Sequence, residues 1–182
     1  MPTPPPDPSL LGRWGFSRAG WRDNRRGEWW LAAQFALIGA LVLAPALPSP
    51  RSLGLAWPQA ARLGGALLLT AGLALALQAL VSLGASLTPL PEPMEGAPLV
   101  REGPYGRCRH PLYQAVLACG LGVALLRGSL LHLALLLALA GVLGGKARRE
   151  ERSLERLHPD YGAYRASTAA IVPGLPWLDW RA

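Results

Sequence analysis

Residues 99–113 hold the densest group of polar, aromatic and turn-forming side chains in a chain whose second half is otherwise apolar. The segment contains three arginines, His110, two tyrosines and two prolines, and an apolar run follows it directly. A second polar cluster, residues 146–152, follows the last apolar run. Charged and aromatic side chains of these types can bind a small polar ligand through hydrogen bonds and ring contacts. We therefore expect the two clusters to meet and to form a cofactor pocket.

The elements that must position these clusters are long and almost free of charge. The chain is 51% hydrophobic and only 16% charged, which is less charge than a soluble domain usually carries. The segments without Asp, Glu, Lys or Arg are residues 29–50, 63–91, 111–126 and 128–145. At ~1.5 Å per helical residue, the first two can cross a hydrocarbon core of ~30 Å, and the last two are marginal. The pattern predicts an all-α integral membrane bundle with about four transmembrane helices, a C-terminal helical hairpin and a cytoplasmic tail.

Breaks in composition divide the chain into three parts. Residues 1–28 form an arm rich in Pro, Trp and Arg, which is typical of a membrane interface. Residues 29–96 hold the first helix pair and its loop, and residues 97–182 form the expected catalytic region. We expect the first two helices at roughly 29–46 and 60–87. We expect glycines on the second helix to let a neighbour approach closely, namely Gly64, Gly65, Gly72 and Gly84.

The third helix is expected to begin at Pro111, which favours the first helical position, and the fourth to end near Gly145. Arg127 and Gly128 form the turn between them. An antiparallel hairpin returns the chain to the side it left, so His110 and Glu150 should lie at the same end. The ring of Tyr113, on the first turn, should lie near His110. Lys146 and Glu150 are four residues apart and can share a helix face, but the sequence leaves open whether Glu150 or Glu151 faces the pocket.

The distribution of basic residues predicts the orientation in the membrane. Of 18 Lys and Arg residues, the N-terminal arm, the 88–110 loop and the C-terminal tail together carry fifteen. With four crossings these three segments share one side, so both termini should be cytoplasmic. We expect a multi-pass protein of a bacterial inner membrane, whose first partner is the lipid bilayer. The basic residues flank apolar runs and do not form a stripe, so we expect no nucleic-acid partner, although an RNA-stacking arm is the alternative for the N-terminal segment.

The residues of each cluster could also have a purely structural role. Residues 146–152 could simply be the solvated end of a membrane helix, and His110 an interfacial capping residue. His132 is expected to be a helix-contact residue and His158 a turn residue. Three scattered histidines and two unpaired cysteines fit no zinc spacing, so we expect no metal.

The order of motifs along residues 97–178 resembles the isoprenylcysteine carboxyl methyltransferases, a family related to the phospholipid N-methyltransferases. The resemblance combines an Arg-His-Pro-x-Tyr box, a hairpin, a Glu-Glu pair and a Tyr-x-x-Tyr tail. It is carried by Leu99, Val100, Gly103, Tyr105, residues 109–113, residues 146–151, Tyr161, Tyr164 and residues 172–176.

The resemblance implies a membrane enzyme that transfers a methyl group from S-adenosyl-L-methionine. It implies cofactor binding by Leu99, Val100, Tyr105, His110, Pro111, Leu112, Tyr113 and Glu150. It also implies that Lys146 contacts the acceptor substrate, with no catalytic residue assigned. We expect a lipophilic or lipidated acceptor. Because lysine stands where relatives acting on carboxylates often have arginine, carboxylate, amine and thiol acceptors all remain open.

Two other functions fit parts of the pattern. Sterol reductases have a similar Arg-His-Pro-x-Tyr hairpin and bind NADPH, but Leu112 stands where they usually have Asn. A non-catalytic membrane scaffold would use both polar clusters only as anchors. The acceptor, the pathway and the oligomeric state do not follow from the sequence.

Overall fold

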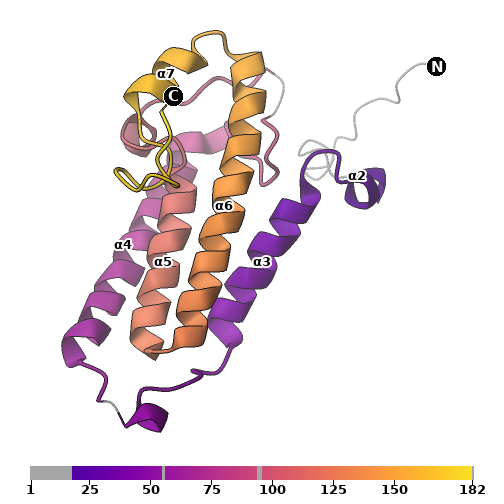
Figure 1. Cartoon of the computed structure of the whole chain (residues 1–182). Coiled ribbons are helices and arrows are strands. Elements are labelled where there is room, and N and C mark those ends of the chain that lie inside the picture. Colours follow the sequence, from indigo (N-terminus) through magenta and orange to yellow (C-terminus); the bar gives the residue numbers. More distant parts are fainter. Residues whose placement is uncertain (1–17, 55, 94–95, 182) are drawn as a thin grey trace.

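The four long helices run in alternating directions along the chain and lie side by side (Figure 1). The structure, a computed structural model, describes residues 18–54, 56–93 and 96–181. Over these residues the structure is helical and contains no strand. The α-helices are α2 (Arg18–Asp23), α3 (Glu28–Leu43), α4 (Gln59–Leu83), α5 (Pro111–Arg127), α6 (Leu130–Leu157) and α7 (Tyr161–Ser167). Short 3₁₀ turns are η1 (Arg51–Leu53), η2 (Gly84–Ser86) and η3 (Gly103–Gly106).

The connections gather at the two ends of the bundle. One end carries α2, the segment between α4 and α5, and α7 with the C-terminal segment (Figure 1). The other end carries the α3–α4 connection and the α5–α6 turn. Both polar clusters therefore lie at the first of these ends, as the hairpin predicted.

Local sequence explains where α3 and α5 begin and end. Ala44 is extended (φ −63°, ψ 144°), because the ring of Pro45 disfavours helical backbone in the residue before it. As a result α3 ends at Leu43 and is shorter than the expected 29–46. Pro111 is the first residue of α5, and Gly128 ends it with a left-handed φ of 58°. The second expected helix also ends early, because η2 replaces its last turn.

The prediction that the fourth helix ends near Gly145 was wrong. Helix α6 continues to Leu157 and carries residues 146–152 on its last turns. Gly145 lies inside the helix and leaves room for the Trp30 ring: an added Cβ would lie 2.4 Å from Trp30 Cη2. The Lys, Arg and Glu residues that follow are good helix formers. The second cluster is therefore a rigid helical face and not the start of a tail.

Two glycines allow α4 and α5 to pack closely. A Cβ added at Gly65 would lie 2.8 Å from the Gly122 carbonyl oxygen, and one at Gly72 would lie 2.6 Å from Cys119 Sγ. Such close approach of helix backbones is typical of membrane bundles. The expectation holds for these two positions. It was wrong for Gly64 and Gly84, where no described atom lies within 4 Å of an added Cβ.

Apolar side chains cover the outer surface of the bundle. On α4, Leu67 is 71% exposed and Val81 is 74% exposed. Two helices are long and apolar enough to cross a membrane, α4 and α6, whereas α3 and α5 are shorter apolar helices. A continuous exposed apolar face is unfavourable in water and suits lipid. That all four helices cross the bilayer stays a prediction.

The N-terminal arm is described only in part. Residues 1–17 of the predicted interfacial arm lie outside the described residues. Within α2, the carbonyl of Trp21 accepts a hydrogen bond of 2.8 Å from the indole of Trp29, and both rings are exposed. Exposed rings beside arginines suit the headgroup region, and that placement also stays a prediction.

The glycine contacts yield a test of the bundle. We expect Gly65→Ala to lower the free energy of unfolding by about 1–3 kcal/mol, because the new methyl group meets the Gly122 backbone. The matched change Gly64→Ala should raise stability by up to about 1 kcal/mol, because it only improves helix propensity. Denaturation in detergent measures both values. Equal effects of the two substitutions would contradict the α4–α5 packing.

Candidate active site

The two polar clusters are in contact at the end of the α5–α6 hairpin. The Tyr113 hydroxyl on α5 donates a hydrogen bond of 2.7 Å to Glu150 Oε2 on α6. His110 precedes α5 and stacks on the Tyr113 ring, with centroids 5.2 Å apart and an interplanar angle of 1°. His110 Nε2 also lies 2.9 Å from Glu151 Oε1. The expected proximity of Tyr113 to His110, and of both to the Glu-Glu pair, is therefore present.

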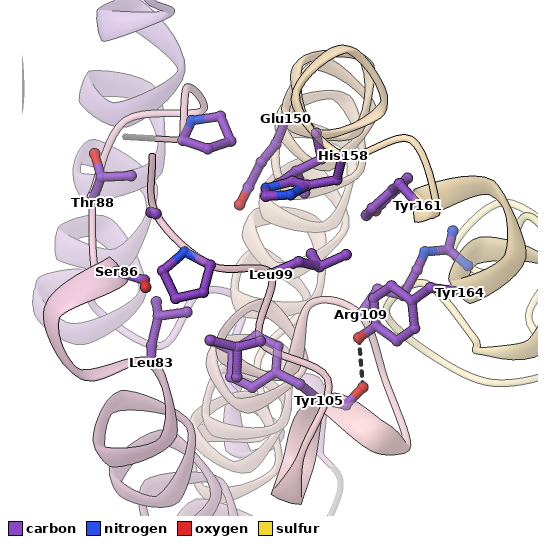
Figure 2. A pocket seen from close by; sticks show the side chains of 15 residues that line it. Leu83, Ser86, Thr88, Leu99, Tyr105, Arg109, Glu150, His158, Tyr161 and Tyr164 are labelled. Atoms are coloured by element: carbon purple, nitrogen blue, oxygen red, sulfur yellow. Dashed lines mark hydrogen bonds between the residues drawn. The ribbon is translucent and has the colours of Figure 1, made fainter. Parts of the chain in front are cut away.

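Two cavities meet at this contact. The loop cavity, with a volume of about 80 Å³, is lined by the segment between α4 and α5, by the end of α6 and by α7 (Figure 2). The bundle cavity, of about 220 Å³, is lined by residues of all four long helices. The residues that line both cavities are Leu83, Thr88, Tyr105, Arg109 and Glu150. Glu150, the carboxylate among them, is therefore accessible from both sides.

The residues predicted to bind a cofactor divide between the two cavities. Leu99 and Val100 line the loop cavity. His110, Leu112 and Tyr113 line the bundle cavity. Tyr105 and Glu150 line both, whereas Pro111 begins α5 and lines neither. The structure thus brings all but one of these side chains to a cavity wall, and their binding of a cofactor stays a prediction.

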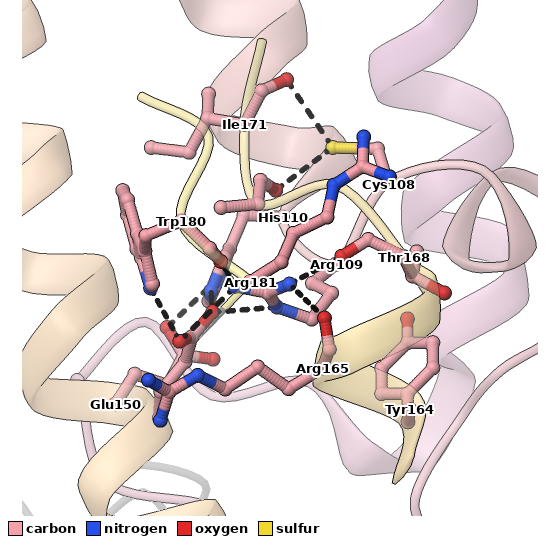
Figure 3. Close-up of polar contacts among 12 residues, drawn as sticks. Cys108, Arg109, His110, Glu150, Tyr164, Arg165, Thr168, Ile171, Trp180 and Arg181 are labelled. Atoms are coloured by element: carbon pink, nitrogen blue, oxygen red, sulfur yellow. Dashed lines mark hydrogen bonds and ion pairs between the residues drawn. The ribbon is translucent and has the colours of Figure 1, made fainter. Parts of the chain in front are cut away.

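Glu151 lines neither cavity and forms a buried ion pair with Arg109, whose surroundings are shown in Figure 3. Arg109 Nε donates to Glu151 Oε1 at 2.8 Å, and Arg109 Nη2 donates to Oε2 at 3.3 Å. The remaining N–H groups of Arg109 donate to the carbonyl oxygens of Arg165, Thr168 and Trp180. All five donors of a guanidinium are thus used, which is the condition for burying this charge. This arrangement assigns the neighbouring carboxylates to different roles.

The C-terminal segment fixes the motif in place. The backbone N–H groups of Arg109 and His110 donate to the carbonyls of Ala169 and Ala170, at 2.8 and 3.0 Å. The Trp180 indole donates to Glu151 Oε2 at 2.6 Å. The Cys108 thiol donates to Ala170 O at 3.0 Å, and burial raises the pKa of this thiol to about 11. Cys108 therefore has a structural role as an uncharged thiol.

Lys146 is buried in the wall of the bundle cavity, with 2% of its surface exposed. Its Nζ donates to Gln34 Oε1 at 2.7 Å and to the Pro89 carbonyl at 2.9 Å. The ammonium also lies 5.2 Å from the centroid of the Tyr113 ring. No ion pair joins Lys146 to Glu150 in the described part of the chain, although they share a face of α6 and both line the bundle cavity. The third N–H of the ammonium has no hydrogen-bond partner among the described residues.

Several residues of the site were missed by sequence reasoning. Gln34 was overlooked, although it is the single polar side chain between Trp30 and Leu43 and could have been flagged on that ground. Trp180 and Thr88 carry no comparable signal, because their contacts depend on the path of segments without regular structure. His158, expected in a turn, follows the last residue of α6 and lines the loop cavity.

Comparison with known proteins identifies the family. The model of the phospholipid methyltransferase family matches residues 60–160, more than half of the chain, and the chain belongs to this family of membrane methyltransferases. The matched region runs from α4 to the residue before α7, so it includes both polar clusters.

One curated relative shares part of this region. The chain is similar to the cobalt-zinc-cadmium resistance protein CzcN of Cupriavidus metallidurans, with 40% identity over 78 residues. The aligned part is 42% of this chain and 36% of that protein, so the chain spans about a third of its relative's length. No solved structure matches.

The different roles of the two carboxylates can be tested by matched substitutions. We expect Glu151→Gln to cost about 3–5 kcal/mol of stability, because it leaves the Arg109 charge buried without a counterion. Glu150→Gln should cost about 1 kcal/mol or less, because the amide oxygen can still accept from Tyr113. Denaturation of both variants in detergent measures the difference. If Glu150→Gln were the more damaging change, the assignment would be wrong.

Proposed function

We propose that the protein is a multi-pass membrane methyltransferase that uses S-adenosyl-L-methionine and acts on a lipophilic or lipidated acceptor. The observation that carries the proposal is the position of Glu150 where two cavities meet, one for the donor and one for the acceptor. An enzyme that transfers a methyl group requires donor and acceptor sites that open onto each other, because the reacting atoms must come within about 3–3.5 Å.

The side chains of the loop cavity suit the methyl donor, which is a nucleoside with a cationic amino-acid arm. Because this cavity holds only about 80 Å³, the donor would extend past Glu150 into the bundle cavity. Glu150 supplies a carboxylate that can accept hydrogen bonds from an ammonium or from ribose hydroxyls. The Tyr105 ring offers a π-face to a cation, and Leu99 and Val100 supply apolar contact for a base. When bound, S-adenosyl-L-methionine supplies an electrophilic methyl group. These residues bind and orient the donor.

Tyr113 and His110 position the carboxylate. The Tyr113 hydroxyl donates to Glu150 Oε2, and His110 Nδ1 lies 3.8 Å from the same oxygen. The stacked rings of His110 and Tyr113 restrict the Glu150 side chain, which lines both cavities. A carboxylate ordered in advance binds a cation with a smaller entropic cost.

The bundle cavity suits an acceptor that combines an apolar body with one polar group. Its apolar wall includes Leu31, Phe35 and Val116, and its polar wall includes Lys146. Because Gln34 and Pro89 hold the ammonium in place, its remaining N–H can donate to a carboxylate, thiolate or amine of the acceptor. The exposed apolar surface of the bundle supports delivery of such an acceptor from the bilayer.

The distribution of charge supports the proposed orientation. The segments rich in arginine gather at the end of the bundle that carries both cavities. We place this end, with both termini, on the cytoplasmic side of a bacterial inner membrane. The family match favours a methyltransferase over a NADPH-dependent reductase or a scaffold without activity.

Calorimetry on the detergent-purified protein tests the proposal. We expect S-adenosylhomocysteine to bind and NADPH not to bind. Glu150→Gln should weaken binding by about 10- to 100-fold, because a charged hydrogen bond is lost, whereas the exposed Glu102→Gln should leave it unchanged. Lys146→Met should keep S-adenosylhomocysteine binding within a few-fold of the wild type, because Lys146 lines only the bundle cavity. Failure of the wild type to bind S-adenosylhomocysteine would refute the proposal.

A further inference from the structure

Tyr161 has a buried hydroxyl with no hydrogen-bond partner among the described residues. The residue is the first of α7 and is only 1% exposed. It nevertheless lines the loop cavity, on the side formed by α7 and together with His158 and Tyr164 (Figure 2). A ligand or a water molecule that reaches the hydroxyl from the cavity would satisfy it.

A neighbouring tyrosine on α7, Tyr164, does have a hydrogen-bond partner for its hydroxyl. The Tyr164 hydroxyl, one turn along the same helix, donates a hydrogen bond of 2.5 Å to the Tyr105 carbonyl. The Tyr113 hydroxyl likewise donates to Glu150. A buried hydroxyl without a partner lowers stability, because it has lost its hydrogen bonds to water. Tyr161 therefore carries a cost to folding that Tyr164 avoids.

The Tyr161 ring packs against a neighbouring ring, and its hydroxyl stays protonated. Its ring packs edge-on against Tyr164, with centroids 5.8 Å apart, and its backbone N–H donates to the His158 carbonyl at 3.0 Å. Burial, reinforced by the charge of Glu151, raises the pKa of Tyr161 far above neutrality. The hydroxyl is thus a hydrogen-bond donor on a packed side chain. Because the Tyr161 side chain has little freedom to lose, a hydrogen bond to a ligand costs little conformational entropy.

We propose that Tyr161 is a ligand-binding residue of the loop cavity, whose hydroxyl donates a hydrogen bond to an acceptor oxygen or nitrogen of the bound methyl donor. The inference rests on the proposed function, since it takes the ligand to be a nucleoside with an amino-acid arm. Such a ligand carries ribose oxygens, ring nitrogens and a carboxylate, and each can accept from a phenol. Tyr161 thereby adds an uncharged hydrogen-bond donor to a cavity in which the Glu150 carboxylate accepts hydrogen bonds.

The test compares Tyr161→Phe with Tyr164→Phe, two changes that each remove one hydroxyl from the same short helix. Thermal unfolding without ligand should show an equal or higher midpoint for Tyr161→Phe, because it removes an unsatisfied group. The midpoint for Tyr164→Phe should fall, because the Tyr105 carbonyl loses its donor. In calorimetry, Tyr161→Phe should weaken S-adenosylhomocysteine binding about tenfold, which is the effect of one lost hydrogen bond.

Stability and affinity together decide the outcome. If Tyr161→Phe unfolds at a lower temperature and binds S-adenosylhomocysteine as tightly as the wild type, the hydroxyl is structural and the inference is overturned. Unchanged affinity with unchanged or raised stability overturns it as well. If the wild-type protein itself fails to bind S-adenosylhomocysteine, the proposed function fails, and this result is distinct from a loss confined to Tyr161→Phe.

Discussion

The buried ion pair between Arg109 and Glu151 joins three segments that are distant in the sequence. Arg109 precedes α5, Glu151 lies on α6, and the carbonyl groups that complete the guanidinium belong to the C-terminal region. Because a buried charge is stable only when all its donors are used, this pair specifies how the hairpin and the C-terminal segment meet. His110 bonds to the same carboxylate, so the ring that contacts the cavity is fixed by the same interaction.

The pair also explains why two adjacent glutamates have different roles. Successive residues of a helix point about 100° apart, so a carboxylate directed toward Arg109 leaves its neighbour directed elsewhere. Glu150 reaches the common wall of the loop and bundle cavities, where Tyr113 donates to it. The arrangement separates the carboxylate that stabilises the site from the carboxylate proposed to bind a ligand. It depends in turn on α6 remaining helical beyond Gly145, where the missing side chain leaves room for the Trp30 ring.

Much of this arrangement could be predicted from local pattern. The hairpin alone places His110 and Tyr113 near Glu150, and Pro111 and Gly128 mark the ends of α5. The pattern could not predict contacts that depend on long-range packing. Lys146 bonds to Gln34 across 112 positions, and no periodicity relates the two. The choice between Glu150 and Glu151 required the position of the C-terminal segment, whose contacts with Arg109 are made by backbone carbonyls and leave no signature in side-chain sequence.

Binding of a methyl donor between the two polar clusters can be tested by ultraviolet cross-linking of radiolabelled S-adenosyl-L-methionine, followed by proteolysis and mass spectrometry. The label should lie on peptides from residues 99–113 or 150–164, and excess S-adenosylhomocysteine should prevent labelling. Label confined to the other end of the bundle, or labelling that S-adenosylhomocysteine does not reduce, would contradict binding between the clusters.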